Sequence, residues 1–139
     1  MKQVAENTFT ASIENIPQMV AFVAENAAAV GVHPKRVMHL ELATEEAVTN
    51  ICSYAYEVPP GLVSIRISRS DVAVQVDFSD NGVPFDPLAA EAPDIQADLD
   101  NREIGGLGIF LIRRLLDEVH YHRRDNRNIL TLVIKNAPE

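Results

Sequence analysis

The chain has 139 residues, 47 % of them hydrophobic, and a formal net charge of −8 from 12 basic and 20 acidic residues. This composition favours one folded domain over residues 1–139, and its acidity argues against nucleic-acid binding, which needs clustered Lys and Arg. No apolar run approaches a membrane span of ~20 residues, no signal peptide is apparent, and the single Cys52 offers no disulfide framework or metal pair. We therefore expect a reduced, cytoplasmic protein.

The first part of the chain predicts one strand and two helices. The strand covers Phe9–Asn15. A helix that opens on proline covers Pro17–Val32, with Gly31 near its end as a helix stop. A second, longer helix covers Pro34–Tyr56. Apolar residues at helical spacing give each helix one buried face. They are Met19, Phe22, Val23 and Val30 in the first helix, and Val37, Leu40, Ala47, Val48 and Ile51 in the second.

The rest of the chain predicts two hairpins separated by a loop and a helix. Leu62–Ser68 and Asp71–Ser79 alternate as strands and form the first hairpin. A structureless loop as long as Leu88–Ile104 is usually functional, often a lid. The remaining elements are a helix and a closing hairpin: Leu107–Val119, then His120–Asp125 and Asn128–Asn136. Helices grouped against a mainly antiparallel sheet predict a two-layer α+β sandwich.

The second predicted helix contains a polar pair. Glu46 and Asn50 are four residues apart, so they lie on one face, one turn apart. A solvated helix face is the ordinary explanation of such a pair. The functional alternative is that Asn50 offers a carbonyl oxygen to Mg²⁺, which prefers oxygen ligands, while Glu46 acts as a general base beside a metal-bound phosphate.

The strand Asp71–Ser79 is followed at once by Asp80-Asn81-Gly82, and then by Pro84. A simple turn explains this sequence, with a positive φ at glycine and a fixed φ at proline. A carboxylate at a strand end is also a good acceptor for an exocyclic amine such as that of adenine. Gly82 has no side chain, so a flat ring could approach its backbone closely.

A glycine-rich segment, Gly105-Gly106-Leu107-Gly108, precedes the third predicted helix. A flexible hinge is one interpretation. Glycines ahead of a helix also expose backbone N–H groups at its positive end, an arrangement that binds phosphate without a lysine. No GK[ST] sequence follows, so this is not a Walker A loop.

These three segments, in this order, resemble the N, G1 and G2 boxes of the GHKL ATPase superfamily, which has the Bergerat fold. The three segments are ELATEEAVTN (41–50), DFSDNGVPFDP (77–87) and IGGLGIFLIRRLLDEVHYHR (104–123). Within the superfamily, the chain closely resembles the small anti-sigma-factor serine/threonine kinases from about Thr8 to Lys135.

The resemblance implies a mixed, mainly antiparallel sheet covered on one face by helices, and a site for ATP and Mg²⁺. Asp80 would accept a hydrogen bond from the adenine amino group, and Gly82 would make room for the base. Asn50 would bind Mg²⁺, and Glu46 would deprotonate a serine or threonine hydroxyl of a protein substrate. Leu88–Ile104 would be the ATP lid, and Gly105, Gly106, Leu107 and Gly108 would surround the phosphates.

The same resemblance implies partners. The kinase would phosphorylate a STAS-domain anti-sigma-factor antagonist, regulate a sigma factor by partner switching, and form a homodimer; no nucleic-acid or membrane partner is expected. The alternative is a catalytically weak module of the same fold that binds proteins in response to nucleotide. The catalytic domain of a histidine kinase is disfavoured, because the sequence shows no helix pair with a phospho-accepting histidine.

Two segments depart from the family pattern. The residues after Asn50 are ICSYAY, where family members often have polar residues, so Ser53 or Tyr54 would have to supply that contact. The last strand lacks the family's frequent Gly-Thr pair. Thr131 is then the candidate to give a hydroxyl to the phosphates.

Overall fold

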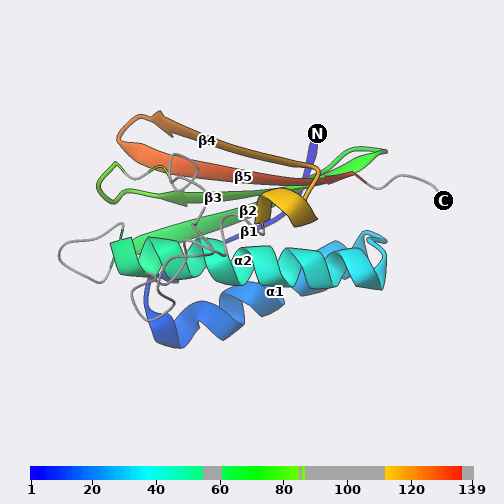
Figure 1. The fold of residues 1–139 in the computed structure, drawn as a ribbon, viewed down its shortest axis with the longest axis horizontal. Coiled ribbons are helices and arrows are strands. Elements are labelled where there is room, and N and C mark those ends of the chain that lie inside the picture. The colour runs from blue at the N-terminus through cyan, green and yellow to red at the C-terminus, as the bar shows by residue number, and fades with distance from the viewer. Residues whose placement is uncertain (55–60, 85, 87–111, 136–139) are drawn as a thin grey trace, which may run out of the picture.

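The computed structural model describes residues 1–54, 61–84, 86 and 112–135. Figure 1 shows two helices packed against one face of a sheet. The elements in chain order are β1 (Lys2–Thr10), the 3₁₀ turn η1 (Ile13–Asn15), α1 (Ile16–Ala29), α2 (Pro34–Tyr54), β2 (Leu62–Arg69), β3 (Ala73–Asp80), β4 (Glu118–Arg124) and β5 (Arg127–Lys135). No helix among the described residues is long and apolar enough to cross a membrane.

The five strands lie in the order β1-β2-β3-β5-β4, and every neighbouring pair is antiparallel. The expected two-layer α+β architecture is confirmed, with an antiparallel sheet throughout the described strands. Both predicted hairpins are present. The β4–β5 hairpin turns through Asp125 and Asn126, whose φ values of 53° and 62° are those of a two-residue type I′ turn.

The first predicted strand, Phe9–Asn15, is misplaced. β1 begins at Lys2 and ends at Thr10, and Ile13–Asn15 forms a 3₁₀ turn instead. The strand pairs with β2 along its whole length, but a register shift between Gln3 and Ala5 interrupts its alternation. The apolar residues therefore lack the period of two that would have indicated a strand from Lys2 onward.

The third predicted helix, Leu107–Val119, is too long at its end. Residues 112–115 are helical, but Glu118 and Val119 already belong to β4. Glu118 pairs with Val133 of β5, and the backbone N–H of Asp117 donates to the Val133 carbonyl (3.1 Å). Pairing with β5 thus decides the conformation of residues whose apolar pattern also fits a helix.

Alternation along β3 separates the two faces of the sheet. Val74, Val76 and Phe78 are buried in the core against the helices, so Asp80, next in the same series, also faces the helix layer. The buried faces of the two helices complete this core: Met19, Val23 and Ala27 from α1, and Leu40, Ala43, Ala47, Val48 and Ile51 from α2. Gln75, Asp77 and Ser79 lie on the opposite face.

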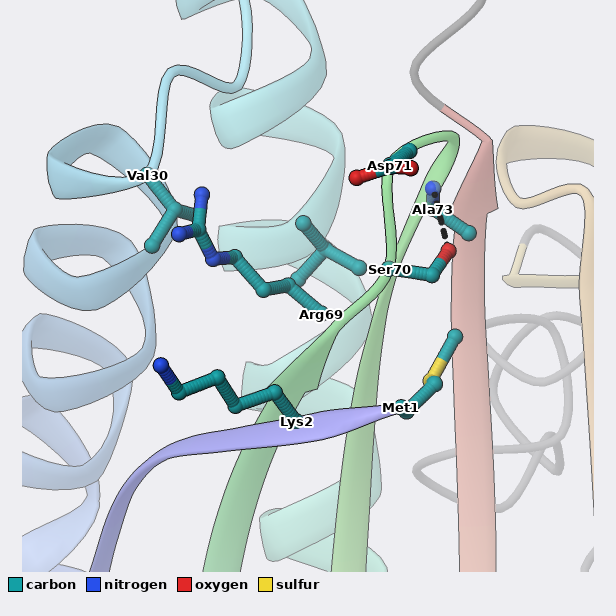
Figure 2. A pocket seen from close by; sticks show the side chains of 8 residues that line it. Met1, Lys2, Val30, Arg69, Ser70, Asp71 and Ala73 are labelled. Carbon is teal, nitrogen blue, oxygen red and sulfur yellow. Dashed lines mark hydrogen bonds between the residues drawn. The ribbon is translucent and has the colours of Figure 1, made fainter.

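The β2–β3 turn lies at the end of β3 remote from Asp80. Ser70 Oγ accepts hydrogen bonds from the backbone N–H groups of Val72 (3.3 Å) and Ala73 (3.1 Å), which fixes the turn. Figure 2 shows the bond between Ser70 and Ala73. Beside it is a surface cavity of about 500 Å³. Its lining includes Lys2, Arg69 and Asp71.

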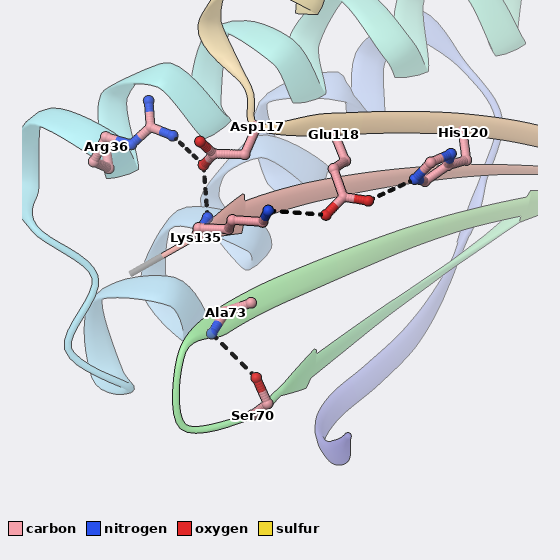
Figure 3. A network of polar contacts seen from close by, with 7 residues as sticks. All are labelled: Arg36, Ser70, Ala73, Asp117, Glu118, His120 and Lys135. Carbon is pink, nitrogen blue, oxygen red and sulfur yellow. Dashed lines mark hydrogen bonds and ion pairs between the residues drawn. The ribbon is translucent and has the colours of Figure 1, made fainter. Parts of the chain in front are cut away.

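Arg36 connects the start of α2 to the segment before β4 and, through Asp117, to the end of β5 (Figure 3). Its guanidinium donates to Asp117 Oδ2 (2.7 Å) and to the Leu115 carbonyl (2.8 Å). Asp117 Oδ2 also accepts from the backbone N–H of Lys135 (2.6 Å). The Arg36 side chain is 28 % exposed, so solvent only partly screens these bonds. They connect the helix layer to β5 at the end of the sheet that carries the β2–β3 turn (Figure 3).

Replacing Arg36 should therefore destabilise the fold. We expect Arg36→Ala to lower the free energy of unfolding by about 1–2 kcal/mol, because it removes the partly buried hydrogen bonds to the Leu115 carbonyl and the His39 ring and the more exposed bond to the Asp117 carboxylate. Urea unfolding followed by circular dichroism measures the change. Lys35→Ala, at the exposed neighbouring position, is the control and should change the value by less than about 0.5 kcal/mol. Equal effects of both variants would contradict the role given to Arg36.

Candidate active site

Three elements converge at the end of the molecule opposite the Arg36 network. Figure 1 shows the C-terminal end of α2, the end of β3 and the turn of the β4–β5 hairpin at this end. Asp80 closes β3 on its helix-facing side. Glu46 and Asn50 lie in the C-terminal half of α2. The fold thus brings both polar groups identified in the sequence to one end of the helix–sheet layer.

Asp80 is 2 % exposed, and its carboxylate is held by N–H donors. Its Oδ1 atom accepts from the backbone N–H of Gly82 (2.9 Å) and from Nδ2 of Asn128 (3.0 Å). Asp80 and Asn128 are directly paired across β3 and β5, which accounts for the second bond. A buried carboxylate at a strand end can accept a further hydrogen bond from the amine of a ligand. Gly82 contributes its backbone N–H to the same arrangement.

Asn128 and Arg123 belong to this site although sequence reasoning did not identify them. Asn128 Nδ2 also donates to the Val83 carbonyl (2.8 Å), and Arg123 Nη1 donates to the Gly82 carbonyl (2.8 Å). Both residues come from the β4–β5 hairpin. The Asp125-Asn126 turn would have indicated that Arg123 and Asn128 are partners, but only the β3–β5 register places Asn128 opposite Asp80.

Glu46 and Asn50 face each other on α2. Asn50 is 4 % exposed, and its Nδ2 lies 3.4 Å from Glu46 Oε1. Burial raises the pKa of Glu46 above its usual 4.5; the hydrogen bond from Asn50 opposes this shift, and the charge of Glu45 adds to it. A carboxylate with a raised pKa is a better proton acceptor near neutral pH than an ordinary glutamate. The pair is therefore suited to general base chemistry.

The oxygen donors of this pair fit Mg²⁺. Because the side-chain nitrogen of Asn50 donates to Glu46, its side-chain carbonyl oxygen remains to bind a cation. The described residues contain no group of three or more His, Cys, Asp or Glu side chains that could hold a metal ion. Magnesium in nucleotide sites commonly uses only one or two protein oxygens, together with water and substrate phosphates. Asn50 is sufficient for that mode of binding.

Thr131 is not brought together with these residues. It pairs with Asp77, and its hydroxyl donates to Asp77 Oδ1 (2.6 Å) on the face of the sheet away from the helices. Asp80 is on the other face. The geometry therefore does not support the expected contact of Thr131 with phosphate.

The remaining predicted site residues lie outside the described part of the chain. Tyr54 is the last residue of α2, and neither its side chain nor that of Ser53 is described. The expected lid, Leu88–Ile104, and the phosphate loop, Gly105, Gly106, Leu107 and Gly108, lie outside the described residues.

Comparison with known proteins identifies the family of this chain. Residues 9–134 match the family described as histidine kinase-like ATPase domain. Serine/threonine-protein kinase BtrW of Bordetella bronchiseptica is 35 % identical over 101 residues, which cover 72 % of this chain and 71 % of that protein. Serine-protein kinase RsbW of Listeria monocytogenes is 31 % identical over 98 residues, covering 67 % of this chain and 62 % of the relative. RsbW of Bacillus cereus is 27 % identical over 95 residues, covering 66 % and 59 %.

The family match covers the helix pair, the buried carboxylate at the end of β3 and all of β5 except its last residue. Two of these relatives, at 35 % and 31 % identity, are named as protein kinases. The chain therefore belongs to the histidine kinase-like ATPase domain family, an ATP-binding family, and is related within it to serine- and serine/threonine-protein kinases.

Proposed function

We propose that this chain is an ATP-dependent serine/threonine protein kinase whose site lies between the C-terminal half of α2 and the end of β3. The observation that carries the proposal is the Glu46–Asn50 pair, a carboxyl with a raised pKa beside a buried amide, on the same side of the sheet as Asp80. In this arrangement Asp80 accepts a hydrogen bond from the adenine amino group, and Gly82 leaves room for the ring.

The reaction needs little covalent chemistry from the protein. The hydroxyl oxygen of the substrate attacks the γ-phosphorus of ATP, the bond to the β,γ-bridging oxygen breaks, and ADP leaves. Glu46 takes the hydroxyl proton. Asn50 would hold Mg²⁺, which would neutralise phosphate charge when bound, and Gly105–Gly108 would hold the phosphates by backbone N–H groups. Positioning and charge neutralisation account for most of the catalysis of phosphoryl transfer.

The substrate that we propose is a STAS-domain anti-sigma-factor antagonist. Resemblance to the anti-sigma-factor kinases supports this choice, and it extends the proposal to a cytoplasmic homodimer that also binds a sigma factor. In this scheme ATP and ADP bias the chain toward one partner or the other. The Leu88–Ile104 segment acts as the ATP lid, within a single domain.

A second candidate is a nucleotide-dependent binding module with little catalysis. The position of Thr131 favours this candidate. Its hydroxyl is hydrogen-bonded to Asp77 on the outer face of the sheet, the face away from the helices, and is not available to the phosphates. ATP would then only create a surface for a partner. Wild-type protein that binds ATP but transfers no phosphate to any STAS-domain protein of its organism would support this candidate over the kinase.

Replacing Asp80 tests the adenine site. We expect Asp80→Asn to weaken ATP and ADP binding by about tenfold to hundredfold, since a hydrogen bond to a charged group is lost. Calorimetry with Mg²⁺ measures both affinities. Asp77→Asn is a matched control, because Asp77 is also buried on β3 but faces the other side of the sheet. Unchanged ATP affinity in Asp80→Asn, or an equal loss in Asp77→Asn, would rule out this position for the adenine.

Replacing Asn50 tests the metal. Binding of ATP should be tighter with Mg²⁺ than with EDTA in the wild type, and Asn50→Ala should lose most of this gain because its oxygen is the proposed ligand. Calorimetry under both conditions gives the ratio of affinities. Thr49→Ala, one residue earlier on α2, should keep the wild-type ratio. A full Mg²⁺ effect in Asn50→Ala would mean that the ion is bound elsewhere.

Replacing Glu46 tests the chemistry. Glu46→Gln should lower phosphate transfer from labelled ATP to the STAS-domain substrate by at least about a hundredfold, with ATP still bound. In the wild type, transfer should fall as the pH drops through the raised pKa of Glu46, so the acid limb lies above 4.5. Glu45→Gln removes a charge that raises this pKa, so it should retain transfer and move the limb to lower pH. Full transfer in Glu46→Gln would exclude Glu46 as the base.

A further inference from the structure

The side-chain amide of Asn128 is the centre of a buried hydrogen-bond network. Its Nδ2 donates to Asp80 Oδ1 (3.0 Å) and to the Val83 carbonyl (2.8 Å). Its Oδ1 accepts from the Tyr121 hydroxyl and from Arg123 Nη1 (3.2 Å). An amide has two N–H donors and two acceptor lone pairs, so these bonds use all four. With Asn128 only 4 % exposed, its orientation is fully determined by the protein.

This network determines which oxygen of Asp80 is available. From the described residues, both hydrogen bonds to the carboxylate end on Oδ1, one from Gly82 and one from Asn128. Two donors on one oxygen fix the rotation of the carboxylate. They also leave Oδ2 as the atom that can accept from a ligand, and an acceptor there requires a donor on the ligand.

Arg123 holds the backbone that follows Asp80. Its Nη1 atom donates both to the Gly82 carbonyl (2.8 Å) and to Asn128 Oδ1, so one guanidinium nitrogen joins the turn to the amide. The turn after β3 is thus bonded to the β4–β5 hairpin at three points: the carboxylate of Asp80 and the carbonyls of Gly82 and Val83. Contacts of this kind keep a recognition group in one geometry.

We propose that Asn128 is a positioning residue that makes the site selective for purines with a 6-amino group over those with a 6-oxo group. The proposal rests on the proposed ATP site. With Oδ1 occupied, the carboxylate presents Oδ2 as a fixed acceptor, which pairs with the 6-amino group of adenine. The 6-oxo group of hypoxanthine would place an acceptor against this oxygen and leave both acceptors unpaired. Buried polar groups that are left unpaired discriminate between ligands more strongly than differences in apolar contact do.

Comparison of ATP with inosine triphosphate (ITP) tests the proposal, since the bases differ in the 6-substituent that faces Asp80. Calorimetry with Mg²⁺ gives the ratio of the two affinities for each variant. We expect Asn128→Ala to weaken ATP by about tenfold and ITP much less, because only ATP uses the carboxylate that Asn128 fixes. The ATP preference should therefore fall about tenfold. Arg123→Ala should shift the ratio in the same direction by a smaller factor, because Asn128 remains.

Arg124→Ala is the matched control, because Arg124 is the next residue on β4, its side chain is 74 % exposed, and its ion pair within the described part of the chain is with Asp125 (3.7 Å). It should keep the wild-type ratio. An unchanged ratio of ATP to ITP affinity in Asn128→Ala would overturn the proposal, whether both affinities fall equally or neither changes. Equal weakening would show that Asn128 has only a structural role. Should Asn128→Ala fail to unfold cooperatively, the Arg123→Ala ratio decides. Failure of the wild type to bind ATP would instead refute the proposed function itself.

Discussion

The buried carboxylate of Asp80 is the constraint on which the candidate site depends. A charged group removed from water is tolerated only when hydrogen bonds replace its hydration. Here the replacement comes from the Gly82 N–H and the Asn128 amide, so both the turn after β3 and the neighbouring strand β5 must adopt one geometry. The cost of burying the carboxylate is thereby linked to the formation of the proposed adenine site.

Alternation along the central strands decides what each polar residue does. Asp77 and Asp80 are three residues apart on β3, so they face opposite sides of the sheet. Asp77 bonds to Thr131 and lies 3.6 Å from the Arg66 guanidinium on the outer face. Asp80 bonds to Asn128 on the face of the sheet that carries the helices. The same register that gives Asn128 to the site removes Thr131 from it, which explains why a hydroxyl expected from the family pattern is engaged elsewhere.

Local patterns predicted most of the fold, and pairing between distant segments accounts for what they missed. Spacing of apolar residues identified both helices, and Gly31, with a φ of 91°, follows α1 as expected. Glu46, Asn50, Asp80 and Gly82 were recognised because each motif is short and contiguous. Asn128 was not, since its role depends on lying opposite Asp80, 48 residues earlier. The displaced start of β1 has the same origin: its pairing with β2 includes a register shift that hides the alternation.

In the proposed site, recognition of the base and transfer of the phosphoryl group fall to different layers of the fold. The groups for the base lie on β3 and β5, while Glu46 and Asn50 lie on α2. Their relative positions are set by the apolar core between them, in which Leu40 and Val48 of α2 are packed together with Phe78 of β3, all fully buried. Native cores are close-packed, so a change in volume there moves one layer against the other. Such a change would alter the distance from base to phosphate without touching any residue of the site.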